Sequence, residues 1–188
     1  MVMVEETYMP LTLFVPDITD EKFQELCEQY SDFRLEYTAD GEVIIMPPTD
    51  PDTGARNAAL THYLRHWAIS EYRGIVTDSS AGFILPNEAR RSPDAAWTTR
   101  GRFGLRSCPE FVVELLSPSN SRKKTHEKML EWIANGIELG WLIDPFQKTV
   151  TIYRPHGDID IRRGIIEIAG EGPIAGFVLD LREIWNVR

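Results

Sequence analysis

The sequence is poor in cysteine, in long apolar runs and in positive charge. Its 188 residues include only two cysteines, Cys27 and Cys108, too few for a disulfide framework and without the spacing of metal ligands. No apolar run approaches the roughly 20 residues that a membrane-spanning helix needs. The first ten residues carry acids where a signal peptide carries Lys or Arg. These absences predict a soluble protein of the reducing cytoplasm.

Positive charge is scarce overall but gathers in one stretch. The chain has 20 Lys and Arg against 29 Asp and Glu, a net charge of −9, which argues against nonspecific coating of DNA. Residues 1–50 hold twelve acids against two bases, whereas residues 90–128 hold nine bases against four acids. The basic stretch is either a phosphate-binding surface or a set of solvated charges that cluster by chance.

The apolar pattern predicts a single α/β domain over residues 1–188. Helices are expected at 17–30, 55–72 and 121–135, and hairpins at 33–47 and 158–170. The run FVVELL at 111–116 is apolar almost throughout, as in a central strand buried on both faces. Strand, helix and strand over 111–143 form a crossover, so we expect a central mixed β-sheet flanked by helices.

Two carboxylates stand at the edges of apolar runs, twenty residues apart. Asp94 follows Pro93, and its alternative interpretation is an ordinary aspartate at the start of a strand. Glu114 lies inside FVVELL, where a lone carboxylate costs several kcal/mol unless it is paired, protonated or metal-bound. Its structural alternative is a buried ion pair with an arginine. Together with a lysine, such carboxylates can hold a divalent metal and stabilise a pentavalent phosphate, so we hypothesise a metal-dependent nuclease site.

Lysine and histidine provide further candidates. Lys128 lies fourteen residues after Glu114, on the expected helix and near its buried edge. It either reaches the end of the sheet or extends along the surface with its ammonium in water. His62 and His66 have a spacing that can bind zinc, but no cysteine or third ligand accompanies them in the sequence pattern.

Four sequence blocks together resemble a known family. These are PD at 93–94, FVVELLSPS at 111–119, EK at 127–128 and GIELGWLIDP at 136–145. They resemble the Uma-type family of restriction endonucleases, within the PD-(D/E)xK nuclease superfamily. The resemblance covers most of the chain, from LEYTADGEVIIMPP to VTIYRP. It implies the restriction-endonuclease-like fold.

The resemblance also implies roles for individual residues. Asp94, Glu114 and Lys128 match catalytic positions, and Asp94, Glu114 and the backbone carbonyl of Leu115 would bind the metal. The superfamily's lysine usually lies two residues after the acid, where this chain has Leu116, so the lysine has moved to the following helix. Glu42 matches an accessory carboxylate, with an exposed strand glutamate as its alternative.

The implied reaction is hydrolysis of DNA with Mg²⁺ or Mn²⁺ as the cofactor. Superfamily members often dimerise to cut two strands, so analogy implies a homodimer. The backbone phosphates are expected to contact Arg100, Arg102, Arg106, Arg122, Lys123 and Lys124. The family often has Asp where this chain has Lys124. The rival hypothesis is a catalytically inactive nuclease-fold module that binds nucleic acid or a protein partner.

Overall fold

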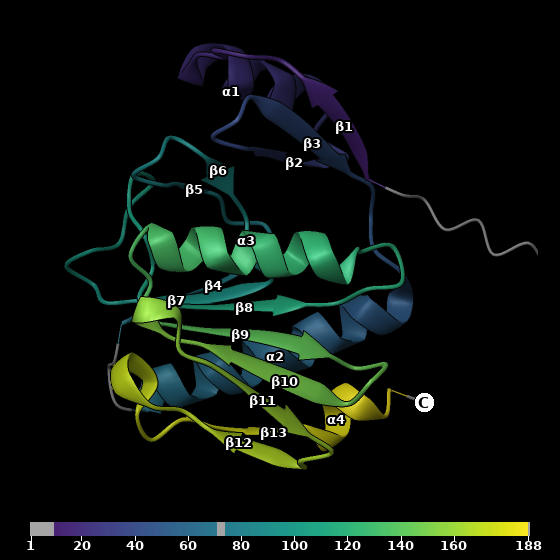
Figure 1. Ribbon diagram of the computed structural model, residues 1–188, viewed down its shortest axis with the longest axis vertical. Coiled ribbons are helices and arrows are strands. Elements are labelled where there is room, and N and C mark those ends of the chain that lie inside the picture. Colours follow the sequence, from purple (N-terminus) through teal and green to yellow (C-terminus); the bar gives the residue numbers. More distant parts are fainter. Residues whose placement is uncertain (1–9, 71–73, 188) are drawn as a thin grey trace, which may run out of the picture.

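A computed structural model describes residues 10–70 and 74–187 of the chain. The acidic first residues and Tyr72, the expected end of a helix, lie outside these ranges. At the centre is a six-stranded sheet with the order β11-β10-β9-β8-β7-β4 (Figure 1). Its strands are β4 (Ile75–Asp78), β7 (Ala95–Thr98), β8 (Phe111–Leu115), β9 (Leu139–Asp144), β10 (Thr149–Tyr153) and β11 (Ile159–Arg163). Strands β8 and β9 are parallel and the other neighbours are antiparallel, which confirms the mixed sheet.

Helices cover both faces of this sheet. The chain crosses from β8 to β9 through α3 (Arg122–Ala134), as the crossover over 111–143 predicts. Alternate residues of β8 point to opposite faces. Phe111, Val113 and Leu115 belong to a core shared with α2 (Pro51–Ser70), whereas Val112 packs with Met129 of α3. This alternation directs Glu114 toward α3.

A smaller sheet lies on the far side of α3 (Figure 1). It has the order β1-β3-β2-β6-β5 and is accompanied by α1 (Asp20–Gln29). Its strands are β1 (Leu11–Phe14), β2 (Arg34–Tyr37), β3 (Glu42–Met46), β5 (Phe83–Ile84) and β6 (Arg90–Arg91). The predicted hairpin of β2 and β3 is present, and Gly41 in its turn has φ of 89°, which favours glycine. Helix α3 therefore lies between two sheets.

The predicted helices are present with shifted ends. Thr19 caps α1, and Ser121 caps α3, each accepting a backbone N–H three residues later. Helix α2 begins at Pro51 instead of Ala55, because Asp50 accepts the Thr53 N–H at 3.0 Å and proline suits the first helical position. No helix of the described residues is long and apolar enough to cross a membrane.

The predicted hairpin at 158–170 is wrong. Strand β11 pairs instead with β10, through the short η1 turn (Pro155–Gly157), and β12 (Glu167–Ala169) pairs with β13 (Val178–Asp180). The backbone N–H of Arg154 donates to the Asp158 carbonyl at 2.9 Å, which closes the β10–β11 turn. The remaining elements are η2 (Gly172–Ile174) and the short α4 (Arg182–Trp185).

Candidate active site

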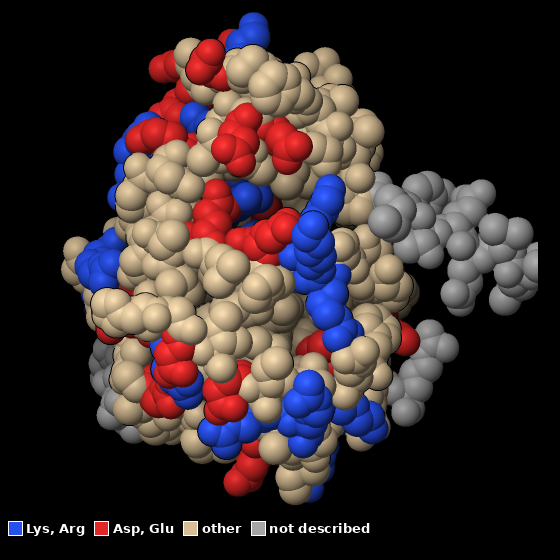
Figure 2. Space-filling view, viewed as in Figure 1, with Lys and Arg blue, Asp and Glu red and all other residues tan. Residues whose placement is uncertain are grey.

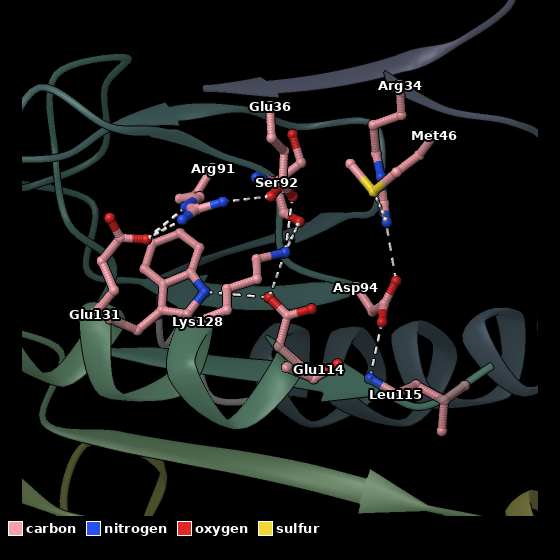
Figure 3. A network of polar contacts seen from close by, with 12 residues as sticks. Arg34, Glu36, Met46, Arg91, Ser92, Asp94, Glu114, Leu115, Lys128 and Glu131 are labelled. Carbon is pink, nitrogen blue, oxygen red and sulfur yellow. Dashed lines mark hydrogen bonds and ion pairs between the residues drawn. The ribbon is translucent and has the colours of Figure 1, made fainter. Parts of the chain in front are cut away.

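Glu114 and Lys128 meet between the central sheet and α3. Lys128 Nζ lies 2.8 Å from Glu114 Oε1, and Trp132 Nε1 donates to the same oxygen at 3.1 Å (Figure 3). Because the Lys128 side chain is only 13% exposed, it does not extend along the surface into water. Glu114 is thus a paired buried carboxylate, but its partner is a lysine and not the arginine of the structural alternative.

A third carboxylate, Glu36 of β2, comes from the smaller sheet and shares the same lysine. Its Oε1 lies 2.7 Å from Lys128 Nζ and accepts the Ser92 backbone N–H at 3.1 Å. Lys128 also donates to the Ser92 carbonyl at 2.9 Å. The sequence prediction missed Glu36. Its signal was available, since Glu36 stands between Leu35 and Tyr37 as Glu114 stands inside its own apolar strand.

Arg91 of β6 completes the network on the side away from Asp94. Its guanidinium lies 3.1 Å from Glu36 Oε2 and 2.5 Å from Glu131 Oε2 (Figure 3). We call Glu36, Arg91, Glu114 and Lys128 the paired half of the site. Each of these charged groups has an opposite charge within 3.1 Å. Charges removed from water are stable only with such partners, so this half is electrostatically complete.

Asp94 lies at the start of β7, beside the carboxyl end of β8. Its N–H donates to the Val113 carbonyl at 3.0 Å, and its Oδ2 accepts the Leu115 N–H at 2.7 Å. Among the described residues, its Oδ1 has only long contacts, at 3.4 Å each, with Arg34 Nη1 and Asn57 Nδ2. We call Arg34, Asn57, Asp94 and Leu115 the open half of the site. The contacts of Asp94 Oδ1 in this half are at the outer limit of hydrogen-bond geometry.

The two halves face different cavities. The open half lines a cavity of about 450 Å³, and the paired half lines one of about 410 Å³. Arg34 lines both, and its second partner is the Met46 thioether at 3.3 Å, a weak acceptor. Figure 2 shows a hollow with acidic walls beside a column of Lys and Arg side chains over the N-terminal end of α3. The sequence prediction missed Arg34 as well, although it stands at the centre of the site.

The two carboxylates that share Lys128 have opposite pKa shifts. Burial raises the pKa of Glu36, but the charges of Lys128, Arg91 and Arg34 outweigh it and bring the pKa to about 2. Burial dominates at Glu114, where the charge of Asp94 adds to it, and the pKa rises to about 7 despite Lys128. Burial lowers the pKa of Lys128, but its two glutamates raise it above its usual value. Lys128 therefore keeps its charge at neutral pH.

The donor atoms of the site suit a hard divalent cation. Asp94 and Glu114 lie on neighbouring strands and offer carboxylate oxygens, the ligands that Mg²⁺ prefers. Asn57 Oδ1 is buried and has no hydrogen-bond partner within the described residues. The Asn57 amide points its Nδ2 at Asp94, and rotating it by about 180° would bring Oδ1 against the Asp94 carboxylate, which would repel it. Oδ1 therefore keeps its position near Asp94 without a hydrogen-bond partner among the described residues. A cation with its water shell would supply the missing partner.

The number of acidic ligands is small. Within the described ranges, no group of three or more His, Cys, Asp or Glu residues forms a metal cluster. A cation at this site would thus depend on two carboxylates together with neutral oxygens, such as the backbone carbonyl of Leu115 and the amide of Asn57. Mg²⁺ keeps several of its waters and accepts such a sparse set of protein ligands.

The predicted phosphate-binding residues fall into two groups. Arg122, Lys123 and Lys124 are exposed at the start of α3, on the same side as the paired half, and Lys124 lines its cavity. Arg100, Arg102 and Arg106 lie in the loop from β7 to β8, which is at the end of these antiparallel strands opposite Asp94 and Glu114. The structure therefore does not bring this second group to the carboxylates. Arg102 pairs with Glu110, and Arg106 pairs with Glu88.

Glu42 is exposed at the start of β3 and lines the outer part of the cavity of the paired half. Its role as an accessory carboxylate stays a prediction. An accessory carboxylate at the site would need a buried position, and Glu36 has such a position whereas Glu42 is exposed.

Comparisons with known proteins agree with this fold. Residues 20–179 match the Uma2 family, whose description is "Putative restriction endonuclease". A solved structure titled as a putative nuclease belonging to DUF820 from Anabaena variabilis ATCC 29413 has a TM-score of 0.77 and 20% sequence identity. The match covers 89% of this chain and 97% of that one. No protein in the curated set matches the chain.

Proposed function

Because this chain belongs to the Uma2 family of restriction-endonuclease-like proteins, we propose that it is a divalent-metal-dependent endonuclease that hydrolyses phosphodiester bonds of DNA. The observation that carries the proposal is the position of Asp94, directly before β7, beside the end of the adjacent strand β8 that holds Glu114, with Lys128 at 2.8 Å from Glu114. This set combines metal-type ligands and a fixed cation within one buried site. A structural protein gains no stability from so costly an arrangement.

Each residue of the proposed site has a chemical task. Asp94, Glu114 and the Leu115 carbonyl would hold Mg²⁺ or Mn²⁺, which supplies Lewis acidity and an activated water for phosphodiester hydrolysis. Lys128 stabilises the negative charge that develops on the phosphate in the transition state. Its raised pKa keeps the ammonium charged for this task.

The partners of Lys128 fix its position. Glu36 and the Ser92 carbonyl hold the ammonium from the side of the smaller sheet, and Arg91 holds Glu36 in turn. Glu36 is therefore a positioning residue, which acts through Lys128. A preorganised cation of this kind needs little reorganisation during the reaction, which is the main source of electrostatic catalysis. A second copy of the chain would supply the site for cutting the second strand.

One observation favours the rival function, a catalytically inactive module that binds nucleic acid or a protein partner. Glu114 Oε1 already accepts from Lys128 and Trp132, and Asp94 already has a cation beside it in Arg34. In such a module these pairs would be permanent, and neither carboxylate would take a metal. The acidic net charge of −9 points the same way.

The experiment that separates the two functions is cleavage of supercoiled plasmid with Mg²⁺ or Mn²⁺. The variants are Asp94→Asn and Glu114→Gln, with Glu167→Gln on the distant strand β12 as the matched control. We expect metal-dependent nicking by the native protein and by the control, and a loss of at least about 100-fold in both site variants. Nicking that survives in both variants, or that needs no metal, would refute the proposed site.

A further inference from the structure

A groove that shares only Asn57 with the open half, and no residue with the paired half, runs along α2. It has a volume of about 580 Å³ and lies between α2 and the end of the edge strand β4. Its lining follows one helical stripe, opposite the stripe that packs on the central sheet. Part of this stripe consists of the small residues Gly54, Ala58 and Thr61. Small side chains let a ligand approach the helix closely.

This groove adjoins the cavity of Asp94. The linings of the two cavities share Thr49, Asn57 and Ser79, so the cavities are neighbours along α2. Asn57 is also the residue that contacts the Asp94 carboxylate. A ligand that follows α2 would therefore reach the neighbouring cavity, which Asp94 lines.

Basic side chains outnumber acidic ones in the described lining of the groove, whereas acidic side chains predominate in the chain as a whole. Arg65 is exposed on the groove-facing stripe of α2, and it takes part in no ion pair among residues 10–70 and 74–187. His62 and His66 lie on the same stripe with stacked rings whose centroids are 6.1 Å apart. The one acid among the described lining residues, Asp78, already accepts the N–H and hydroxyl of Ser80. On a chain with a net charge of −9, this set of one arginine, two histidines and one hydrogen-bonded aspartate makes the groove locally basic in composition.

We propose that this groove binds the phosphodiester backbone of a nucleic-acid strand and leads it to Asp94. The stripe from Gly54 to Ile69 is about 22 Å long at 1.5 Å per residue. Each strand of a duplex carries one phosphate per 3.4 Å of the duplex axis, so that length corresponds to about six phosphates of one strand. Only the destination at Asp94 rests on the proposed function, since the binding depends on the charge and shape of the groove alone.

The proposal replaces part of the sequence prediction. Arg100, Arg102 and Arg106 were expected to hold the backbone, but they lie at the opposite end of β7 and β8. The groove provides basic side chains on the side of Asp94 that sequence order did not reveal. His62 lies one helical turn before Arg65 and His66, so the three basic side chains lie close together on α2.

Binding can be measured without cleavage by fluorescence anisotropy of the native protein in EDTA. The probes are fluorescein-labelled DNA of about 20 nucleotides, single-stranded and duplex, over a range of salt concentrations. The test variant is Arg65→Glu, and the matched control is Arg100→Glu, an exposed arginine with the same charge change. Far-ultraviolet circular dichroism verifies that both variants fold. A second test variant, His62→Gln with His66→Gln, keeps hydrogen-bonding capacity without a basic ring.

We expect Arg65→Glu to weaken binding by about tenfold or more and to reduce the salt slope by about one, with Arg100→Glu within about twofold of native. The histidine variant should fall between them. Whichever probe binds more tightly identifies a single strand or a duplex as the ligand. An equal loss of DNA affinity in Arg65→Glu and Arg100→Glu, or no DNA binding by the native protein, would refute the proposed binding groove. If DNA binding depends on Arg65 but the protein does not cleave DNA with any metal, the proposed binding groove is supported and the proposed nuclease activity is refuted.

Discussion

The paired half and the open half of the site contain similar residues in different states. In the paired half, each charged group has an opposite charge within 3.1 Å. In the open half, the contacts of Asp94 Oδ1 are 3.4 Å long and Asn57 Oδ1 has no partner in the described part of the chain. Buried polar groups are normally satisfied, so the contrast is informative. The paired half holds Glu114 and Lys128 in fixed positions, and the open half is where a ligand can add contacts.

The largest expected effect is on the stability of the paired half. Lys128→Met leaves Glu114 buried without its cation, and breaking a buried pair costs about 3–5 kcal/mol. Lys124→Met, on the exposed side of the same helix, should change the free energy of unfolding by no more than about 0.5 kcal/mol. Urea unfolding at neutral pH in EDTA measures both. Equal stability of the two variants would mean that the pairs in the paired half contribute nothing to the fold.

The next effect is the opposite pH dependence of Glu36 and Glu114. Because the folded pKa of Glu36, about 2, is below its usual 4.5, its stabilisation is present above 4.5 and is lost as the pH falls toward 2. The folded pKa of Glu114, about 7, is above its usual 4.5, so its contribution is full below 4.5 and is lost as the pH rises through 7. Each corresponds to roughly 3 kcal/mol.

Unfolding free energies of Glu36→Gln and Glu114→Gln, measured from about pH 3 to pH 8 in EDTA, separate the two contributions. Relative to native protein, the deficit of Glu36→Gln should shrink toward low pH. The native protein should lose stability relative to Glu114→Gln as the pH rises from about 5 to 8. If both differences change in the same direction, the assignment of opposite shifts is wrong.

The smallest effect concerns the open half. Arg34→Met removes a cation beside Asp94 that competes with a bound metal. We expect calorimetry to show a three- to tenfold tighter binding of Mn²⁺, about 1 kcal/mol, as suits a partly exposed pair. Arg163→Met, on the edge strand β11, should leave the affinity unchanged. Weaker binding in Arg34→Met would show that Arg34 supports the metal ligands.

Local sequence patterns predicted the central part of the fold well. The continuous apolar run around Glu114 predicted a central strand, and the following helical pattern predicted α3 and the parallel partner β9. Lys128 lies close to Glu114 because α3, which connects β8 with its parallel neighbour β9, packs on the sheet that holds Glu114. These features depend on neighbours in the chain, which a pattern can express.

The missed and misplaced residues depend on contacts between distant segments. Glu36 reaches Lys128 across 92 positions and Asn57 reaches Asp94 across 37, and neither pairing is written in local spacing. Arg100 was grouped with the site because it follows Asp94 closely in sequence. The antiparallel pairing of β7 with β8 carries it to the other end of the sheet. Closeness along an extended strand is therefore a poor guide to closeness at a site.

Binding of Mn²⁺ to the metal-free protein, measured by isothermal titration calorimetry, tests the central claim most directly. The native protein and Glu167→Gln should bind the ion with the same affinity, and Asp94→Asn should lose at least about 100-fold, because it removes a carboxylate ligand from the open half. Equal binding by the native protein and Asp94→Asn would contradict the account. It would place the cation elsewhere and leave the open half without a ligand.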